Sequence, residues 1–186
     1  MASTSDIRNG MCINFNNDIW SIVSFQHVKP GKGAAFVRTK LKSLTKGKVV
    51  DNTFPAGHKI DEVRVERRHF QFLYKDDMGY NFMNMETYDQ ITLQESLIEN
   101  PKFLKGEMMV EVLYHAEKDV PLNMEMPVLA EYKVTYTEPG VKGDTATNTL
   151  KPATIDTNVE VRVPLFINEG DTIKVNPRTG EYQGRA

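Results

Sequence analysis

The chain has 186 residues, a formal net charge of −2 at pH 7 and a hydrophobic fraction of 40%, which is typical of a folded chain rather than a disordered one. No stretch approaches the roughly 18 consecutive apolar residues of a membrane span, and the N-terminus lacks a signal-peptide pattern, so we expect a cytoplasmic protein without membrane contact. The single cysteine, Cys12, excludes an intramolecular disulfide and a thiolate metal cage, and is expected to be a small buried residue.

Positive charge is concentrated in the N-terminal third. Residues 1–65 contain ten Lys/Arg and five Asp/Glu, whereas residues 66–127 contain six and twelve. No acidic residue lies between Ile19 and Val50, the interval that holds Lys29, Lys32, Arg38, Lys40, Lys42, Lys46 and Lys48. This pattern predicts a surface that binds phosphate groups, and the alternative is a solvated lysine face without a partner.

Runs of β-branched and aromatic residues predict strands along most of the chain. The first third contains MCINF, DIWSIVSF, AAFVRTKLKSL and KGKVVDNTF, which indicate a small antiparallel barrel. A second β unit begins near Glu66, where residues 74–80 form a hairpin turn between FQFLY and YNFMNM. A third unit follows Pro127, with VLAEYKVTY, VEVRVPLFI and DTIKVN as strands and NPRTGEY as a turn into a last short strand.

Only residues 94–104 have a helical pattern, and Pro101 limits its length. Many short strands with one short helix predict an all-β protein of three consecutive small barrels that resemble OB folds. The expected domains are residues 1–65, 66–127 and 128–186, joined by short connections and arranged as an elongated molecule.

The segment Lys29-Pro30-Gly31-Lys32-Gly33 separates two predicted strands. Proline at the second turn position and glycine at the third predict a type II turn, which would leave Lys32 at the tip of a hairpin between two glycines. An amine in this position is sterically open to a modifying enzyme or a narrow cavity. Pro-Gly-Lys-Gly is also common in ordinary solvated turns, so these residues alone do not decide between the two interpretations.

Longer blocks carry a family resemblance. The stretch FQHVKPGKGAAFVRTKLKSLTKGKVVDNTF resembles the signature loop region of bacterial elongation factor P, a family related to the hypusine-bearing translation factors of archaea and eukaryotes. YNFMNMETYDQITL and YTEPGVKGDTATNTLKPATIDTNVEVRVPLFINEGDTIKVNPRTGEY are also similar to this family, so the likeness covers nearly the whole chain. Asn158 departs from the glycine that we expect at its position, but asparagine also tolerates left-handed backbone geometry.

The resemblance implies an N-terminal KOW/SH3-like barrel over residues 1–65, followed by OB barrels over 66–127 and 128–186, in a tRNA-like shape. It implies a translation elongation factor that binds between the peptidyl and exit tRNA sites of the ribosome and stimulates peptide-bond formation at stalled polyproline stretches. A modified Lys32 would reach the CCA end of the peptidyl-tRNA. The implied partners are the ribosome (rRNA and ribosomal proteins), the peptidyl-tRNA and a lysine-modifying enzyme, and the factor is expected to be a monomer.

Further site residues follow from the same resemblance. Arg38, Lys40 and Lys42 alternate along one predicted strand, so they share a face that would meet tRNA backbone. Gly143-Asp144-Thr145 matches the family's loop near the exit-site codon, although without the family these residues indicate only a turn. Tyr182 and Arg185 resemble residues that family members use on the ribosome and tRNA, and a packed tyrosine and a frayed terminal arginine are the alternatives.

An enzyme is not expected. The four histidines, His27, His58, His69 and His115, have no ligand spacing, and no nucleophile elbow, Walker loop or dinucleotide fingerprint is present, so we expect no catalytic residue, cofactor or metal. The alternative function is a general single-stranded nucleic-acid-binding protein with OB folds, in which Tyr74, Tyr80 and Phe82 would stack on bases. Their acidic surroundings favour core packing instead. The sequence leaves open whether Lys32 is modified, whether a modification is a lysyl or an alkyl-alcohol extension, and whether the chain is a specialised paralogue.

Overall fold

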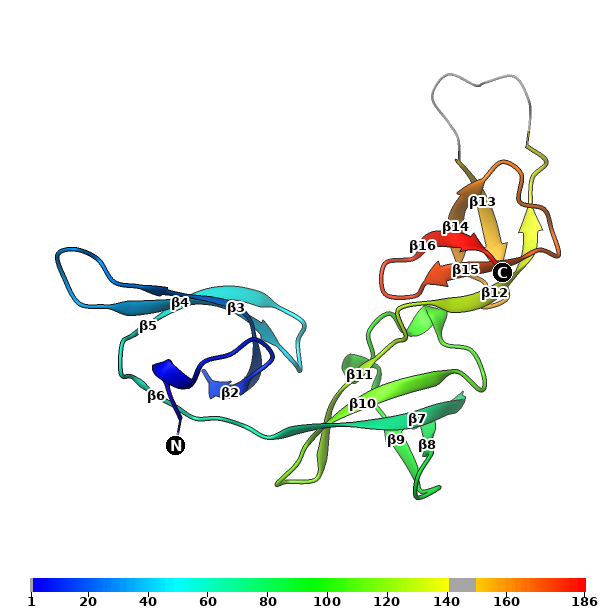
Figure 1. The fold of residues 1–186 in the computed structure, drawn as a ribbon. Coiled ribbons are helices and arrows are strands. Elements are labelled where there is room, and N and C mark those ends of the chain that lie inside the picture. Colours follow the sequence, from blue (N-terminus) through cyan, green and yellow to red (C-terminus); the bar gives the residue numbers. More distant parts are fainter. Residues whose placement is uncertain (1, 141–149) are drawn as a thin grey trace. The chain divides into compact units, whose positions relative to one another are not determined.

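A computed structural model describes residues 2–140 and 150–186 (Figure 1). The protein is built from strands with a few short 3-10 helices, which confirms the predicted all-β class. The chain divides into two compact units, Met1–Arg68 with Val112–Asn123, and His69–Glu111 with Met124–Ala186.

The N-terminal sheet is antiparallel, with strand order β2-β3-β4-β5. It contains β2 (Cys12–Phe15), β3 (Asp18–Val28), β4 (Phe36–Ser43) and β5 (Val49–Pro55). The 3-10 helix η1 (Thr4–Asp6) follows β1 (Ala2–Ser3), which pairs with β6 (Lys59–Ile60). The core of this domain is apolar and contains Ile7, Met11, Ile13, Trp20, Ile22, Val37, Leu41, Phe54 and Ile60.

Strand β4 shows why this domain can have an apolar interior and a basic surface. Successive side chains of a strand point to opposite faces, and in β4 the buried positions are Val37, Thr39, Leu41 and Ser43. The alternate positions are exposed or half-buried, and they hold Arg38, Lys40 and Lys42. The prediction that these three cations share one face is therefore confirmed.

The central sheet has the order β11-β10-β7-β8-β9. Its strands are β7 (Val65–Asp76), β8 (Gly79–Asn84), β9 (Gln90–Leu93), β10 (Met109–His115) and β11 (Val120–Glu125). The hairpin predicted for residues 74–80 is confirmed. The Asp76 carboxylate stabilises its turn by accepting hydrogen bonds from the backbone N–H groups of Met78 at 2.9 Å and Gly79 at 3.1 Å.

The C-terminal sheet has the order β14-β13-β12-β15-β16. Its strands are β12 (Ala130–Thr137), β13 (Leu150–Ile155), β14 (Glu160–Pro164), β15 (Thr172–Asn176) and β16 (Glu181–Arg185). The two edge strands β14 and β16 also contact each other, so the sheet curls toward a barrel. Its interior contains Tyr132, Val134, Ile155, Val163, Ile167, Ile173 and Val175, all buried.

The helix predicted over residues 94–104 is wrong in type. The structure has two 3-10 helices there, η2 (Glu95–Leu97) and η3 (Pro101–Phe103). Asn100 between them has a left-handed backbone with φ of 54°. Proline lacks an N–H and disfavours the α conformation of the residue before it, so a continuous α-helix cannot pass through this point.

The departure at Asn158 is accommodated as expected. Asn158 has φ of 61° in the turn between β13 and β14, and its backbone N–H donates to the carbonyl of Ile155 at 2.8 Å. Asparagine is one of the few residues with a side chain that adopt this geometry readily.

Candidate functional site

The Lys32 loop comprises Lys29 to Ala35 and joins β3 to β4 (Figure 1). The two strands pair up to Val28 and Phe36, so β3 extends beyond its predicted end near Phe25, whereas β4 begins two residues after its predicted start at Ala34. At its base, the backbone N–H of Ala56 donates to the carbonyl of Ala35 at 2.9 Å, which links the return of the loop to the end of β5. At the base of the loop, β4 is therefore paired on both sides, with β3 and β5, whereas the loop end of β3 pairs with β4 alone.

The predicted type II turn is wrong. Such a turn requires positive φ at its third residue, but Gly31 lies outside the positive region, while Gly33 has φ of 110°. The loop is longer than a two-residue turn, so the chain reverses without left-handed geometry at Gly31. The glycine that the backbone requires is Gly33, the last residue before the two alanines that lead into β4.

Lys32 is sterically open, as predicted. Its side chain is exposed, and no residue in the described ranges forms a hydrogen bond or an ion pair with its ammonium group. A Cβ placed on the neighbouring Gly31 would meet no atom within 4 Å, and one on Gly33 would meet only Pro30 Cγ at 3.8 Å. The amine can therefore be approached by an enzyme or by a narrow cavity.

The exposed face of β3, β4 and β5 carries the basic residues in cross-strand rows. In one row, Arg38 lies between Gln26 and Thr53. In the next row, farther from the Lys32 loop, Lys40 lies between Ser24 and Asp51. The Arg38 guanidinium lies 5.5 Å from the centre of the Phe36 ring, a cation–π contact that orients it near the loop. This face combines clustered positive charge with exposure, which a phosphate-binding surface needs.

The turn after β4 is held by the Asp18 carboxylate. It accepts hydrogen bonds from the hydroxyls of Ser43 at 2.7 Å and Thr45 at 2.6 Å. Burial alone would raise the pKa of Asp18, but these hydrogen bonds, the backbone N–H of Ile19 and the nearby charge of Lys46 lower it overall. Asp18 is thus an anion at neutral pH and fixes the turn that carries Lys46 and Lys48.

The predicted C-terminal site residues are only partly placed. Gly143, Asp144 and Thr145 lie outside the described residues. Tyr182 is half-buried on β16 opposite Val175, and Arg185 forms an ion pair with Asp171 at 2.9 Å. Arg185 is therefore not a frayed terminal residue, although most of its side chain is exposed.

The aromatic residues of the central sheet form a core rather than a stacking surface. Tyr80 and Phe82 are 7% and 0% exposed, and the Phe82 ring packs against Phe72 with centroids 5.3 Å apart. Tyr74 is exposed, so it alone of the three candidates could stack on a base. Core packing is therefore confirmed for Tyr80 and Phe82 and wrong for Tyr74, and the burial of two of the three rings weakens the alternative of a single-stranded nucleic-acid-binding protein.

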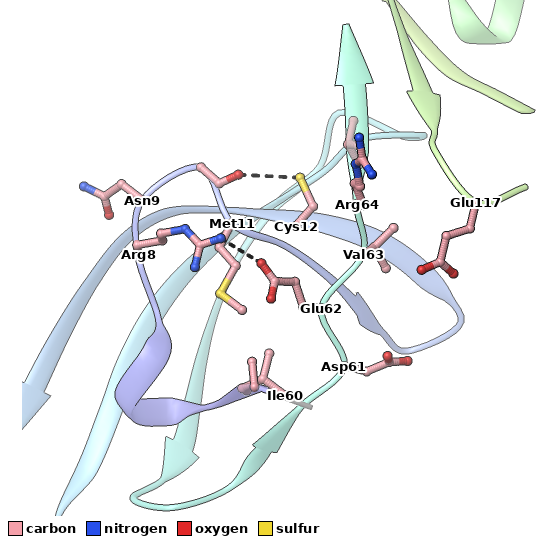
Figure 2. A pocket seen from close by; sticks show the side chains of 13 residues that line it. Arg8, Asn9, Met11, Cys12, Ile60, Asp61, Glu62, Val63, Arg64 and Glu117 are labelled. Atoms are coloured by element: carbon pink, nitrogen blue, oxygen red, sulfur yellow. Dashed lines mark hydrogen bonds and ion pairs between the residues drawn. The ribbon is translucent and has the colours of Figure 1, made fainter. Parts of the chain in front are cut away.

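A cavity of about 750 Å³ in the N-terminal unit shows no catalytic arrangement (Figure 2). Arg8 forms an ion pair with Glu62 at 2.8 Å, and the Cys12 thiol donates to the carbonyl of Gly10 at 3.6 Å. Asp61 accepts a hydrogen bond from Asn14 at 2.9 Å. Burial raises the pKa of the half-buried Cys12 thiol, so it is neutral and a poor nucleophile.

In the described ranges, 2–140 and 150–186, no group of three or more His, Cys, Asp and Glu residues could hold a metal ion. No helix in these ranges is long and apolar enough to span a bilayer.

The sequence interpretation missed Asp51, which lies on the basic face. The acid-free interval ends at Val50, so the sequence places Asp51 just beyond the basic cluster. Its position opposite Lys40 is set by the register of β4 and β5, which the sequence does not specify.

The comparisons with known proteins agree along the whole chain. Residues 3–60 match the elongation factor P KOW-like domain, residues 65–123 the elongation factor P OB domain, and residues 130–185 the elongation factor P C-terminal domain. The chain is 59% identical over 185 residues to "Elongation factor P" of Christiangramia forsetii, covering 100% of this chain and 98% of the relative. It is 50% identical over 186 residues to "Elongation factor P" of Rhodococcus erythropolis, covering 100% and 98%.

Solved structures of low identity share the fold. "Eukaryotic translation initiation factor 5A from Methanococcus jannaschii" aligns with a TM-score of 0.51 and 19% identity over 68% of this chain and 90% of that chain. An eIF-5A family protein from Naegleria fowleri aligns with a TM-score of 0.52 and 17% identity, over 67% of this chain and 96% of that chain.

Proposed function

Because the chain belongs to the elongation factor P family, a family of translation elongation factors, we propose that it restores peptide-bond formation on ribosomes stalled at consecutive prolines. In this proposal it binds between the peptidyl and exit tRNA sites, and Lys32 reaches the CCA end of the peptidyl-tRNA. The ribosome performs the chemistry, and the factor supplies positioning.

The observation that carries the proposal is the state of Lys32. It lies on a loop between two long paired strands, it is exposed, and no described residue engages its ammonium group. Proline constrains the backbone on both sides of the bond that must form, so a productive geometry has to be imposed from outside. A free cationic tip on an anchored hairpin suits this task, and a covalent extension by a lysine-modifying enzyme would lengthen its reach.

We propose that the basic face of β4 lies along the acceptor arm of the peptidyl-tRNA. Arg38, Lys40 and Lys42 share this face, and phosphate contacts of this kind fix position on RNA without reading sequence. In a plot of the logarithm of the binding constant against the logarithm of salt concentration, each lost phosphate contact should reduce the magnitude of the slope by about one or slightly less.

The remaining parts of the proposal concern the rest of the chain. Residues 1–65, 66–127 and 128–186 act as three barrel domains of a cytoplasmic monomer. In the last of them, Gly143, Asp144 and Thr145 contact the exit-site codon region, while Tyr182 and Arg185 contact the ribosome or tRNA. The three adjacent family matches support this division, and the exposure of Arg185 is compatible with such a contact.

The test compares wild-type protein from its own cells with Lys32→Ala, Lys32→Arg and Lys29→Ala in translation of a reporter with three consecutive prolines. Intact and peptide masses show whether Lys32 carries an added group. Lys29→Ala is the matched control, because it removes an exposed lysine from the same loop. We expect wild type and Lys29→Ala to relieve the pause and Lys32→Ala to fail.

Lys32→Arg separates charge from modification, because arginine keeps the cation but cannot accept a lysine modification. Activity of Lys32→Arg equal to that of wild type would show that the charge alone is enough. If modified wild-type protein left the pause unchanged, the proposal would be wrong and general nucleic-acid binding would become the better explanation.

A further inference from the structure

A hollow of about 450 Å³ lies on the exposed face of the N-terminal sheet. Strands β3, β4 and β5 each contribute to its lining, which includes Ser24, Gln26, Arg38, Lys40, Asp51 and Thr53. Two cations, one carboxylate and several neutral hydrogen-bonding groups thus meet in one place. This is a richer set than a surface that only attracts phosphate requires.

Asp51 is the unexpected member of this set. It is exposed and lies directly opposite Lys40 in the β4–β5 register, where side chains of opposite strands come within about 5.5 Å at Cβ. Across the described residues, its carboxylate has neither a hydrogen bond nor an ion pair, and the same is true of the Lys40 ammonium. Both groups are therefore free to contact a ligand.

A carboxylate weakens a purely phosphate-binding surface, because like charges repel. RNA, however, offers one group along its backbone that a carboxylate binds well. Phosphate oxygens only accept hydrogen bonds, whereas the ribose 2′-hydroxyl next to each phosphate also donates. A pair of cations beside one unpaired carboxylate therefore matches a ribose–phosphate unit, and DNA lacks the donor.

We propose that this hollow is a ribose–phosphate subsite in which Arg38 and Lys40 contact phosphate and Asp51 accepts a hydrogen bond from a ribose 2′-hydroxyl. The inference rests on the proposed function, because it takes this face to be the one that lies on tRNA. It adds a specificity determinant: Asp51 makes the face select RNA over an equally charged nucleic acid without 2′-hydroxyls.

The test measures binding of the full-length chain to two hairpins of the same acceptor-stem sequence. One is RNA, and the other is 2′-fluoro RNA, which keeps A-form geometry but has no 2′-hydroxyl donor. The variants are Asp51→Ala, which removes the acceptor, and Asp51→Asn, which keeps a neutral one. Glu160→Gln is the matched control, since Glu160 is an exposed strand residue of the C-terminal sheet and the change in net charge equals that of Asp51→Asn. Circular dichroism checks that each variant is folded.

We expect wild type to prefer RNA and Asp51→Ala to lose about tenfold in affinity for RNA while its affinity for 2′-fluoro RNA is unchanged or rises, because a hydrogen bond to a charged group contributes on this order. Asp51→Asn should show a smaller loss, and Glu160→Gln should leave the preference intact. If Asp51→Ala strengthened or weakened binding to both hairpins equally, the 2′-hydroxyl contact would be refuted.

Arg38→Ala separates this failure from failure of the proposed function. If Arg38→Ala weakens binding to both hairpins while Asp51→Ala shifts them equally, the face still binds RNA backbone and only the subsite inference fails. If wild type binds neither hairpin, or if Arg38→Ala has no effect on either, the tRNA-facing role of this sheet fails and the subsite inference fails with it.

Discussion

Replacing Gly33 with alanine should impair translation of polyproline stretches without unfolding the protein. Gly33 has φ of 110°, a value that residues with a side chain rarely adopt. The added Cβ has space, since its nearest neighbour would be Pro30 Cγ at 3.8 Å, so the penalty is backbone strain of about 1–2 kcal/mol. Because the loop is exposed, it can relieve the strain by leaving its present geometry, which would then be about 5- to 30-fold less populated.

The assay is a titration of factor against pause relief in reconstituted translation of a reporter with three consecutive prolines. The concentration of Gly33→Ala that gives half-maximal relief should rise about 5- to 30-fold, while its melting temperature stays close to that of wild type. Gly31→Ala is the matched control: its φ lies outside the positive region and no atom lies within 4 Å of the added Cβ, so its titration should shift little. An equal loss in both variants would show that space inside the ribosome, and not backbone geometry, limits the loop. Full activity of Gly33→Ala would refute the requirement for the present loop geometry.

Three further predictions concern stability. Tyr132 is fully buried and its hydroxyl donates to the Phe103 carbonyl at 2.8 Å. Tyr132→Phe should therefore lower the free energy of unfolding, measured by urea titration, by about 1–3 kcal/mol. An unchanged free energy of unfolding would mean that the carbonyl finds another donor. The pKa of Asp18 is lower in the folded state than in the unfolded state, so the ionised carboxylate stabilises the fold fully above the unfolded-state pKa of about 4, and this contribution is lost as pH falls through the folded-state pKa. The difference in unfolding free energy between wild type and Asp18→Asn should therefore shrink from pH 7 toward about pH 3. A difference that stays constant with pH would contradict this assignment. Asn158→Gly should leave stability unchanged or raise it, whereas Asn158→Ala should destabilise the protein by about 1 kcal/mol, because φ of 61° is unfavourable for alanine but not for glycine. Thermal melting distinguishes the two variants. Equal melting temperatures would argue against backbone strain at this position.

The sequence predicts well the features that depend on neighbouring residues. The period-2 alternation of β4 separates the buried Leu41 from the exposed Lys40. The acidic composition around Phe82 also correctly predicts that this residue packs in the central core. Turn chemistry locates the hairpin over residues 74–80 because Asp76 and Gly79 have strong local preferences. These features follow from local chemistry and need no knowledge of the whole fold.

Features that depend on loop length or strand register are not predictable in this way. The left-handed conformation belongs to Gly33 and not to Gly31, because the loop has more residues than the predicted tight turn. Residues 94–104 break into two 3-10 helices at Asn100 rather than forming one shortened helix. The position of Asp51 opposite Lys40 is fixed by the register in which β4 pairs with β5. The local sequences of the two strands are compatible with several registers, so they do not predict this one.

The structure also explains why the hairpin is anchored at its base and free at its tip. A surface ion pair contributes only about 0–1 kcal/mol to stability, so an internal partner for Lys32 would stabilise the fold little. The same partner would have to be displaced each time the amine entered another cavity, and it would compete with a modifying enzyme. Stability therefore comes from buried residues such as Ile22 and Leu41 in the paired strands, both 0% exposed. The fold therefore does not need an internal contact of the Lys32 amine, and all hydrogen-bond donors of the amine remain available to a binding partner.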